Sequence, residues 1–596
     1  MSEATFEQEI SRIVWQTKYR AEGETDVRDT WRRVARAVAG VEREPERWQA
    51  RFYQLLADFK FLPGGRILAG AGTGRQVTLF NCFAMGLIED SLDGIFEALK
   101  EGALTMQQGG GVGYDFSTLR PRGSRARRAG NVASGPVSFM RIFDVACATL
   151  LSTGSRRGAM MATLRCDHPD VAEFIEAKRD PDALRNFNLS VKVTDDFMTA
   201  VEGDRDWPLV FPAERLAPGC GEGGVMRQWP GYDRPVPCRV LKVVRARELW
   251  DRLMRATYEV AEPGVLFIDR INRLNNLYYC ERIHTTNPCS ELPLPPYGAC
   301  DLGSINLVRF VRDPFGAGAQ IDFDAIAATV PVAVRFLDDV IDLSRFPLAK
   351  QRDQAHRTRR IGLGFTGLAD ALLMVGVHYA SEEARRLAGR ITATICHAAF
   401  RASAELAREK GAFPLFDRDA YLQGRFVARL PEAIRQAIAE HGLRNSHLLA
   451  IAPTGSISLL AGNVSSGLEP VFAWRYRRVL QLGDGECRRV AVADVAWQLW
   501  QRRFPGKPVP DHFVTATELA PEAHLAMQAA VQAHVDNAIS KTIHVPADFP
   551  FEDFLGIYHR AYRLGLKGCT TYRPNPVRGT VLVTEAHCCD INREGD

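Results

Sequence analysis

Residues 285–294 read TTNPCSELPL, and this stretch places a cysteine, Cys289, between the amide of Asn287 and the carboxylate of Glu291. A cysteine with a purely structural role usually lies among apolar neighbours, whereas this thiol is two residues from each polar group. Prolines at positions 288, 293, 295 and 296 restrict the backbone around it. The segment is therefore interpreted as a stiff loop that presents a thiol.

The composition is that of an ordinary globular protein. Of 596 residues, 46% are hydrophobic and 24% are charged, which excludes a disordered or collagen-like chain. The net charge of +4 is too small to indicate a general nucleic-acid binder. The start lacks the apolar core of a signal peptide, and no run of about 18 apolar residues follows. We therefore expect a cytoplasmic protein that does not bind a membrane.

The cysteines do not suggest a disulfide framework or a metal site. There are thirteen of them, but no CxxC pair and no HExxH sequence. In a reducing compartment such cysteines stay free, so no structural disulfide and no metal is expected. Redox or radical use of particular thiols remains open.

The hydrophobic patterns predict a mixed α/β protein in three parts. Residues 1–75 show helical spacing and form an N-terminal helical region, residues 76–575 alternate strands with helices, and residues 576–596 form a polar tail. The Ser followed by acidic residues at position 381 predicts the start of a helix over 381–411. The predicted strands are 77–87, 186–193, 264–272 and 447–453.

Three glycine-rich or hydroxyl-rich segments were considered as nucleotide sites. GLGFTG (362–367) satisfies the pattern GxGxxG but follows no predicted strand, so we interpret it as a close-packed helix start. In QQGGGVGYDFSTLRP (107–121) the glycines are interpreted as allowing positive φ or close backbone approach. PTGSIS (453–458) follows a predicted strand, and on its residues alone it is either a phosphate-binding turn or an ordinary Ser/Thr helix cap.

Five cysteines together indicate a reaction. Cys82, Cys289 and Cys300 lie in LFNCF, TTNPCSELPL and YGACDLGSINL, and Cys588 and Cys589 lie in the tail. Reduction of a ribonucleotide needs one radical cysteine, two that deliver electrons and two that replace them. The chain resembles the adenosylcobalamin-dependent, class II ribonucleotide reductases in these segments and in FLPGGRILAGAGT, GGGVGYDFSTLRPRGS, RRGAMMATLRCDHPDVAEFI, NLSVKVTDDFM, RRIGLGFTGLAD, APTGSIS, SSGLEP and DNAISKT.

The resemblance implies a fold and a set of reacting groups. The fold is a ten-stranded α/β barrel around a finger loop with Cys289 at its tip. Cys289 would take the 3′-hydrogen of the ribose as a thiyl radical, and Glu291 would remove the 3′-hydroxyl proton. Asn287 would orient the substrate hydroxyls, and Cys82 and Cys300 would reduce the 2′-carbon.

The resemblance also implies binding residues for the substrate and an effector. With a nucleotide substrate, the phosphate interpretation of PTGSIS is preferred over a cap. The substrate-binding residues are then Asn81, Thr454, Gly455, Ser456 and Ile457. The residues implied for a deoxynucleoside triphosphate effector, which would choose the substrate base, are Asp115, Arg120, Arg156 and Arg157.

The cofactor follows from the resemblance and from exclusion. The stretch GLKGCTTYRPNP has no Tyr-Tyr pair, which reductases with a separate metal-radical subunit carry, and no glycyl-radical element is present. Adenosylcobalamin remains as the radical source. The other implied partners are a ribonucleotide, with a diphosphate favoured over a triphosphate, a thioredoxin- or glutaredoxin-like reductant and a second copy of the chain in a homodimer.

Two alternatives to this assignment remain, and the tail departs from the family pattern. The chain could be the large subunit of a class I reductase, which the missing Tyr-Tyr pair disfavours. It could also be an inactive nucleotide-binding paralogue, although a binder has no need of Cys82, Cys289, Glu291 and Cys300 together. The tail departs from the family because Cys588 and Cys589 are adjacent, so a reductant shuttle, a metal-binding pair and a vestigial tail stay open.

Overall fold

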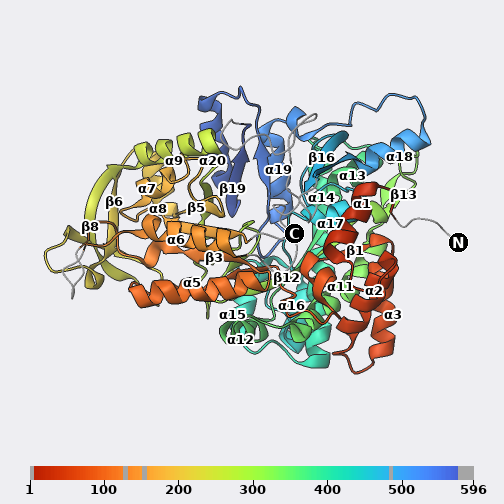
Figure 1. Ribbon diagram of the computed structural model, residues 1–596, viewed down its shortest axis with the longest axis horizontal. Helices are drawn as coiled ribbons and strands as arrows, with labels where there is room; N and C mark the ends of the chain where they lie inside the picture. The colour runs from red at the N-terminus through yellow and green to blue at the C-terminus, as the bar shows by residue number, and fades with distance from the viewer. Residues whose placement is uncertain (1–5, 125–131, 151–157, 482–486, 575–596) are drawn as a thin grey trace.

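The N-terminal helical region packs on one flank of the molecule (Figure 1). The fold is a computed structural model that describes residues 6–124, 132–150, 158–481 and 487–574. Trp31, Val34 and Val38 are buried on one face of the second helix, as their spacing predicts. The helices of this region are α1 (Glu9–Val14), α2 (Val27–Ala39), α3 (Pro45–Leu56) and α4 (Gly65–Gly70). The predicted mixed α/β fold with an N-terminal helical region is confirmed.

One large sheet organises the rest of the chain. The strand order is β1-β12-β2-β3-β4-β5-β9-β19-β18, and β15 pairs with β12. Strands β2, β3, β4, β5 and β9 are parallel to one another. At one side of this set β2 pairs antiparallel with β12, and at the other side β9 pairs antiparallel with β19. The strands are β1 (Phe61–Pro63), β2 (Cys82–Ala84), β3 (Gly111–Asp115), β4 (Met160–Arg165), β5 (Phe187–Val193), β9 (Gly264–Phe267), β12 (Ala299–Asn306), β15 (Ile361–Thr366), β18 (Thr542–His544) and β19 (Gly568–Tyr572).

Single bridges continue the sheet beyond β15. Leu363 of β15 bridges Leu449 in parallel, and Ile451 bridges Ile539, three residues before β18 begins. The predicted strand over 447–453 is therefore reduced to two isolated bridges. Its backbone bonds partly to side chains, because the N–H groups of Leu448 and Leu449 both donate to the carboxylate of Asp536.

Two apolar cores fill the space between the sheet and its helices. The larger core joins the N-terminal helices to α11 (Phe323–Leu343) and α14 (Glu382–Lys410). The second core lies between β3, β4, β5 and β9 and the helices that cover them. These covering helices are α5 (Leu92–Gln107), α6 (Pro136–Thr149), α9 (Ala246–Val260) and α20 (Phe551–Arg563). Figure 1 shows α5 and α6 side by side in the half of the molecule away from the N-terminal helices.

Helix α14 was predicted with its start correctly placed. The helix spans Glu382–Lys410, and the Ser381 hydroxyl accepts a hydrogen bond from Ala384 N at 3.0 Å. This bond satisfies one of the N–H groups that have no partner within a helix.

Three other predictions are corrected. GLGFTG forms strand β15, followed by helix α13 (Leu368–Met374), and is not itself a helix start. Its glycines let two backbones meet, since a Cβ on Gly364 would lie 2.3 Å from the carbonyl oxygen of Ala450. Within 77–87 only Cys82–Ala84 form a strand, because Leu79 N and Phe80 N bond to hydroxyls. The strand predicted over 264–272 ends at Phe267, where helix α10 (Ile268–Arg273) begins.

Among the helices of the described residues, none is both long and apolar enough to cross a membrane.

Candidate active site

The stretch TTNPCSELPL forms a hairpin with a six-residue tip. Strands β10 (Thr285–Thr286) and β11 (Pro293–Leu294) pair antiparallel, which leaves residues 287–292 as the loop. Ser290 adopts the left-handed conformation with φ of 67°. The tip is held from within, because Asn287 N donates to Leu292 O at 3.2 Å and Leu292 N donates to the Asn287 side-chain oxygen at 3.0 Å.

Neighbouring segments of the chain also hold the tip of the loop in place. The Asn188 side chain on β5 donates to Pro288 O at 2.9 Å, and Ala538 N donates to Glu291 O at 2.9 Å. On β3 the approach is so close that a Cβ on Gly113 would lie 1.8 Å from the carbonyl oxygen of Thr286. The segment GGGVGYDF was therefore interpreted correctly as allowing close backbone approach.

Cys82 and Cys300 lie directly opposite each other on neighbouring strands. They are Cα partners in the antiparallel pair of β2 and β12, and both are buried. Two residues away, Ala84 N donates to Gly298 O, so Cys82 and Cys300 again form a hydrogen-bonded pair with Cα atoms about 5.5 Å apart. A disulfide needs a separation of about that size.

The loop and the cysteine pair meet in one buried space. The Asn287 side-chain nitrogen donates to the sulfur of Cys82 at 3.1 Å. Burial raises the pKa of Cys300 well above its usual value, and the neighbouring carboxylates of Asp301 and Glu291 act in the same direction. Glu291 is completely buried beside this pair, and the raised pKa of Cys300 keeps that side chain a neutral thiol.

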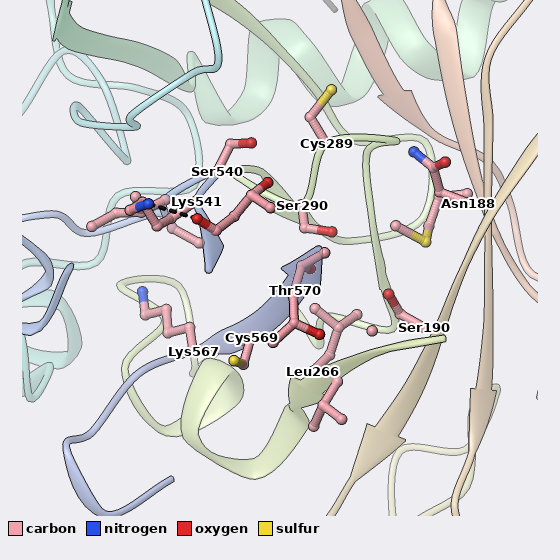
Figure 2. Close-up of a pocket in the computed structure, with 18 of the residues that line it drawn as sticks. Asn188, Ser190, Leu266, Cys289, Ser290, Ser540, Lys541, Lys567, Cys569 and Thr570 are labelled. Atoms are coloured by element: carbon pink, nitrogen blue, oxygen red, sulfur yellow. Dashed lines mark hydrogen bonds between the residues drawn. The ribbon is translucent and has the colours of Figure 1, made fainter. Parts of the chain in front are cut away.

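A cavity of about 300 Å³ opens on one side of the loop. Cys289 and Ser290 form its wall on the loop, and Lys567, Cys569 and Thr570 form the wall opposite (Figure 2). The Cys289 side chain is half-buried, in contrast to the buried Cys82 and Cys300. Cys289 therefore adjoins both the cavity and the loop residues that reach the cysteine pair.

The segment PTGSIS begins helix α17 (Gly455–Leu460). The Thr454 hydroxyl lies 2.9 Å from that of Thr366 and accepts a bond from Gly467 N at 2.9 Å. The Ser456 hydroxyl bonds to the phenol of Tyr19 in the N-terminal region. These side chains have internal partners, so the groups that remain for an anion are the backbone N–H groups of the first turn.

Three further predicted residues have clear positions. Asn81 is buried before β2, where its carbonyl oxygen accepts Gly111 N at 2.8 Å. Asp115 forms a buried ion pair with Lys192, which also donates to His284 O at 3.0 Å, so this pair supports the base of the hairpin. Arg120 pairs with Asp90 at 2.7 Å. Arg156, Arg157, Cys588 and Cys589 lie outside the described residues.

Sequence reasoning missed residues that position the site through distant contacts. Tyr19, Asn188, Thr366 and Ala538 contact the loop or helix α17 from separate elements. Only Gly113 carried a usable signal, as part of a glycine run. Within the described part of the chain, no group of three His, Cys, Asp or Glu side chains is arranged to hold a metal ion.

Comparisons with known proteins give two family matches that together span most of the chain. The family described as ribonucleotide reductase, barrel domain, matches residues 80–572, and ribonucleotide reductase, all-alpha domain, matches residues 5–76.

Curated relatives give the same picture. The vitamin B12-dependent ribonucleoside-diphosphate reductase of Mycobacterium tuberculosis is 41% identical, over 93% of this chain and 77% of its own length. The protein of the same name from Thermoplasma acidophilum is 37% identical, over 88% of this chain and 65% of its own length. The ribonucleoside-diphosphate reductase subunit alpha of Chlamydia muridarum is 27% identical, over 95% of this chain and 58% of its own length.

A Gly113→Ala substitution tests how tightly the hairpin is seated. The new Cβ would collide with the Thr286 carbonyl, so we expect a loss of about 1–3 kcal/mol in the free energy of unfolding and faster hydrogen exchange in residues 285–294. Denaturant unfolding and exchange mass spectrometry measure both. Gly74→Ala is the control, since no atom lies within 4 Å of its Cβ. Equal free energies of unfolding for the two variants would contradict the close contact between Gly113 and the Thr286 carbonyl.

Mild oxidation tests the cysteine pair. Diamide should remove two hydrogens from the protein and join Cys82 to Cys300, because their Cα atoms already have disulfide spacing. Peptide mass spectrometry identifies the cross-linked peptides. Cys300→Ser should abolish this cross-link and leave thiol oxidation elsewhere unchanged. Cys82 that remains unlinked in the oxidised, unaltered protein would contradict the pairing.

Proposed function

The chain belongs to the ribonucleotide reductase family, and from this we propose that it reduces ribonucleoside diphosphates to 2′-deoxyribonucleotides with adenosylcobalamin as cofactor. The observation that carries the proposal is the meeting of the loop with the cysteine pair. Asn287 touches Cys82, Cys82 faces Cys300, and Glu291 is buried beside them.

The proposed chemistry uses each group for one task. Cys289, as a thiyl radical, takes the hydrogen atom from the 3′-carbon of the ribose, and Glu291 accepts the proton of the 3′-hydroxyl. The 2′-hydroxyl leaves as water. Cys82 and Cys300 supply two electrons and become a disulfide, so one ribonucleotide and two thiols give one deoxyribonucleotide, one disulfide and one water.

The protonation of Cys300 supports this division of roles. Because burial raises the pKa of Cys300, its thiol keeps its hydrogen at neutral pH and can deliver it to the substrate. The Asn287 amide is neutral, so it can orient a substrate hydroxyl without competing with Glu291 for the proton.

We propose that the substrate is held by Asn81 and by the first turn of α17, from Thr454 to Ile457. The backbone N–H groups of that turn would donate hydrogen bonds to the diphosphate. The hydroxyl of Thr454 acts indirectly, since it is bonded to Thr366 and Gly467 and keeps the turn in place.

We propose that the sheet closes into a ten-stranded barrel around the loop. The parallel set β2, β3, β4, β5 and β9 would form one half, and β12, β15, residues 449–451, β18 and β19 the other. The single bridges at Leu449 and Ile451 support this, as does the hairpin, which contacts Asn188 on β5 and Ala538, next to the bridged residue Ile539. A closed interior would shield a thiyl radical from water.

The cavity beside Cys289 suits the proposed cofactor in its chemistry. Short hydroxyl side chains line it at Ser190, Ser540 and Thr570. The side-chain oxygen of Gln528 is buried at its wall and has no protein partner among the described residues. Such acceptors match the amide and hydroxyl donors of adenosylcobalamin, which supplies radical initiation when it is bound. Gln528, Ser540 and Thr570 would hold it next to Cys289.

The relatives disfavour the class I alternative. The vitamin B12-dependent reductases of Mycobacterium tuberculosis and Thermoplasma acidophilum are 41% and 37% identical to this chain over the aligned residues, whereas the subunit alpha of Chlamydia muridarum is 27% identical. The four groups Cys82, Cys289, Glu291 and Cys300 disfavour an inactive paralogue, because a nucleotide binder has no need of all four. The contact of Asn287 with Cys82 and the pairing of Cys82 with Cys300 support this.

Two partners are proposed from the sequence. A deoxynucleoside triphosphate would bind near Asp115, Arg120, Arg156 and Arg157 and select the base. A thioredoxin- or glutaredoxin-like protein would reduce the tail cysteines, Cys588 and Cys589, which would then reduce the internal disulfide.

An apolar face on α5 and α6 supports a homodimer. Five large side chains on these two helices are between 40% and 66% exposed, namely Leu92, Phe96, Leu104, Ile142 and Val145. Exposed apolar patches usually mark contacts with a partner. We propose that a second copy of the chain covers this face.

Anaerobic turnover tests the function. The purified protein with dithiothreitol should convert CDP to deoxyCDP only when adenosylcobalamin is added. Cys289→Ala should abolish product, and Glu291→Gln should lower the rate by about 10²–10⁴-fold through loss of the proton acceptor. Liquid chromatography measures the product, and CTP serves as the matched substrate control. Turnover by Cys289→Ala would refute the radical role, and cobalamin-independent turnover would refute the cofactor.

A charge in the apolar face tests the dimer. The double substitution Phe96→Asp and Val145→Asp should convert a dimer into a monomer, because each charge would be buried without a partner. Light scattering after size exclusion measures the mass. Met226→Asp is the control, since Met226 is similarly exposed but lies outside these helices, on strand β7 (Glu222–Arg227). A dimer that survives the double substitution would place the interface elsewhere.

A further inference from the structure

A buried lysine lies at the wall of the Cys289 cavity. Lys541 lines the cavity, and its side chain is fully shielded from solvent (Figure 2). Its ammonium donates to Glu469 Oε2 at 2.5 Å, to Thr542 O at 2.6 Å and to His524 Nδ1 at 2.8 Å. Burial and the neighbouring Lys541 lower the pKa of His524 to about 2, so its ring is neutral and can accept. All three ammonium donors are therefore used.

Glu469 forms a second hydrogen bond with the segment that carries Lys541. Its Oε1 accepts a hydrogen bond from Thr542 N at 2.8 Å, while its Oε2 accepts from Lys541. The carboxylate thus spans the first residue of β18 and the residue before it. Glu469 lines a second cavity of about 300 Å³, which shares Pro453 with the Cys289 cavity. The ion pair separates the two cavities.

The segment that carries Glu469 also contacts the proposed phosphate turn. Gly467 N donates to the hydroxyl of Thr454 at 2.9 Å and to that of Thr366 at 3.2 Å. A Cβ on Gly467 would lie 2.6 Å from Ala452 O, so the two backbones are in close contact. Residues 465–470 therefore extend from the turn at Thr454 to the ion pair at the cavity wall.

The segment that carries Lys541 in turn contacts the loop. Ala538 N donates to Glu291 O at 2.9 Å, three residues before Lys541. Ser540 N donates to Ile451 O at 2.9 Å, close to Pro453 and Thr454. Hydrogen bonds and two short stretches of chain, residues 467–469 and 538–541, thus join the turn at Thr454 to the Glu469–Lys541 pair and to the loop beside Cys289.

We infer that the Glu469–Lys541 ion pair couples nucleotide binding at the turn beginning at Thr454 to cofactor binding in the Cys289 cavity. The inference rests on the proposed function, since it takes the two ligands from it. A nucleotide bound at the turn restrains residues 465–470 further through the contacts of Gly467, and through Glu469 it restrains Lys541 at the cavity wall. The cofactor then binds a more rigid wall, so each ligand strengthens the binding of the other. Glu469 and Lys541 are positioning residues.

The coupling is measured as a ratio of dissociation constants. Equilibrium dialysis of the full chain in the dark gives the Kd of adenosylcobalamin with and without CDP. In the unaltered protein we expect CDP to lower this Kd about fivefold or more, and adenosylcobalamin to lower the Kd of CDP by the same factor. In Glu469→Gln, which keeps the side-chain shape but removes the charge, we expect both ratios to fall below about twofold.

Two further variants separate the coupling from stability. Glu42→Gln removes a carboxylate from another buried cluster, where Glu42 pairs with Arg335 and Lys410, and it should keep the full ratio. The double variant with Lys541→Met and Glu469→Gln leaves no uncompensated buried charge, so it provides the test if the single variant unfolds. In this double variant, too, both ratios of dissociation constants should fall below about twofold.

The outcomes distinguish this inference from the proposed function. Full coupling in both Glu469→Gln and the double variant would overturn the inference. Cofactor binding that CDP does not change in the unaltered protein would also overturn it and would leave the proposed function standing. Failure of the unaltered protein to bind adenosylcobalamin at all would overturn both.

Discussion

The side chain of Asn287 is the contact on which the site depends. Its oxygen accepts Leu292 N and closes the six-residue loop, while its nitrogen donates to the sulfur of Cys82. One amide therefore sets the shape of the loop and its distance from the cysteine pair. Because both roles use the same planar group, the loop cannot shift without also changing its contact with Cys82.

Close packing around this loop requires residues without side chains at particular points. Gly113 admits the Thr286 carbonyl, and a Cβ on Gly362 would lie 3.3 Å from the sulfur of Cys300 and closer still to Leu302 and Ala450. The glycines of GGGVGYDF and GLGFTG therefore allow close packing against neighbouring backbone, as at Gly113, and against side chains, as at Gly362. A nucleotide-binding turn would use such glycines for a ligand, which explains why the pattern GxGxxG alone is a weak signal.

What could be predicted from the sequence depends on the range of the contacts involved. Helix α14 was predicted because its cap and its apolar spacing are local features. The cysteine set was identified by resemblance, and the structure brings Cys82 and Cys300 together on paired strands. The internal bonding of Thr454 to Thr366 could not be predicted, since it joins residues 88 positions apart. The same holds for the ion pair between Asp115 and Lys192, whose partners lie on separate strands.

The N-terminal helical region contributes to the site through helix α17. A helix of six residues is too short to be stable alone, so its geometry must come from its neighbours. Three side chains from the first 19 residues supply part of that support. Tyr19 bonds to the Ser456 hydroxyl, Ser11 donates to Leu459 O at 2.6 Å, and Gln8 donates to Gly462 O at 2.6 Å. The polar groups of this region thus hold α17 from one side while Thr366 and Gly467 hold Thr454 from the other. The proposed phosphate turn is therefore built jointly by two parts of the chain, and these contacts orient its first-turn N–H groups.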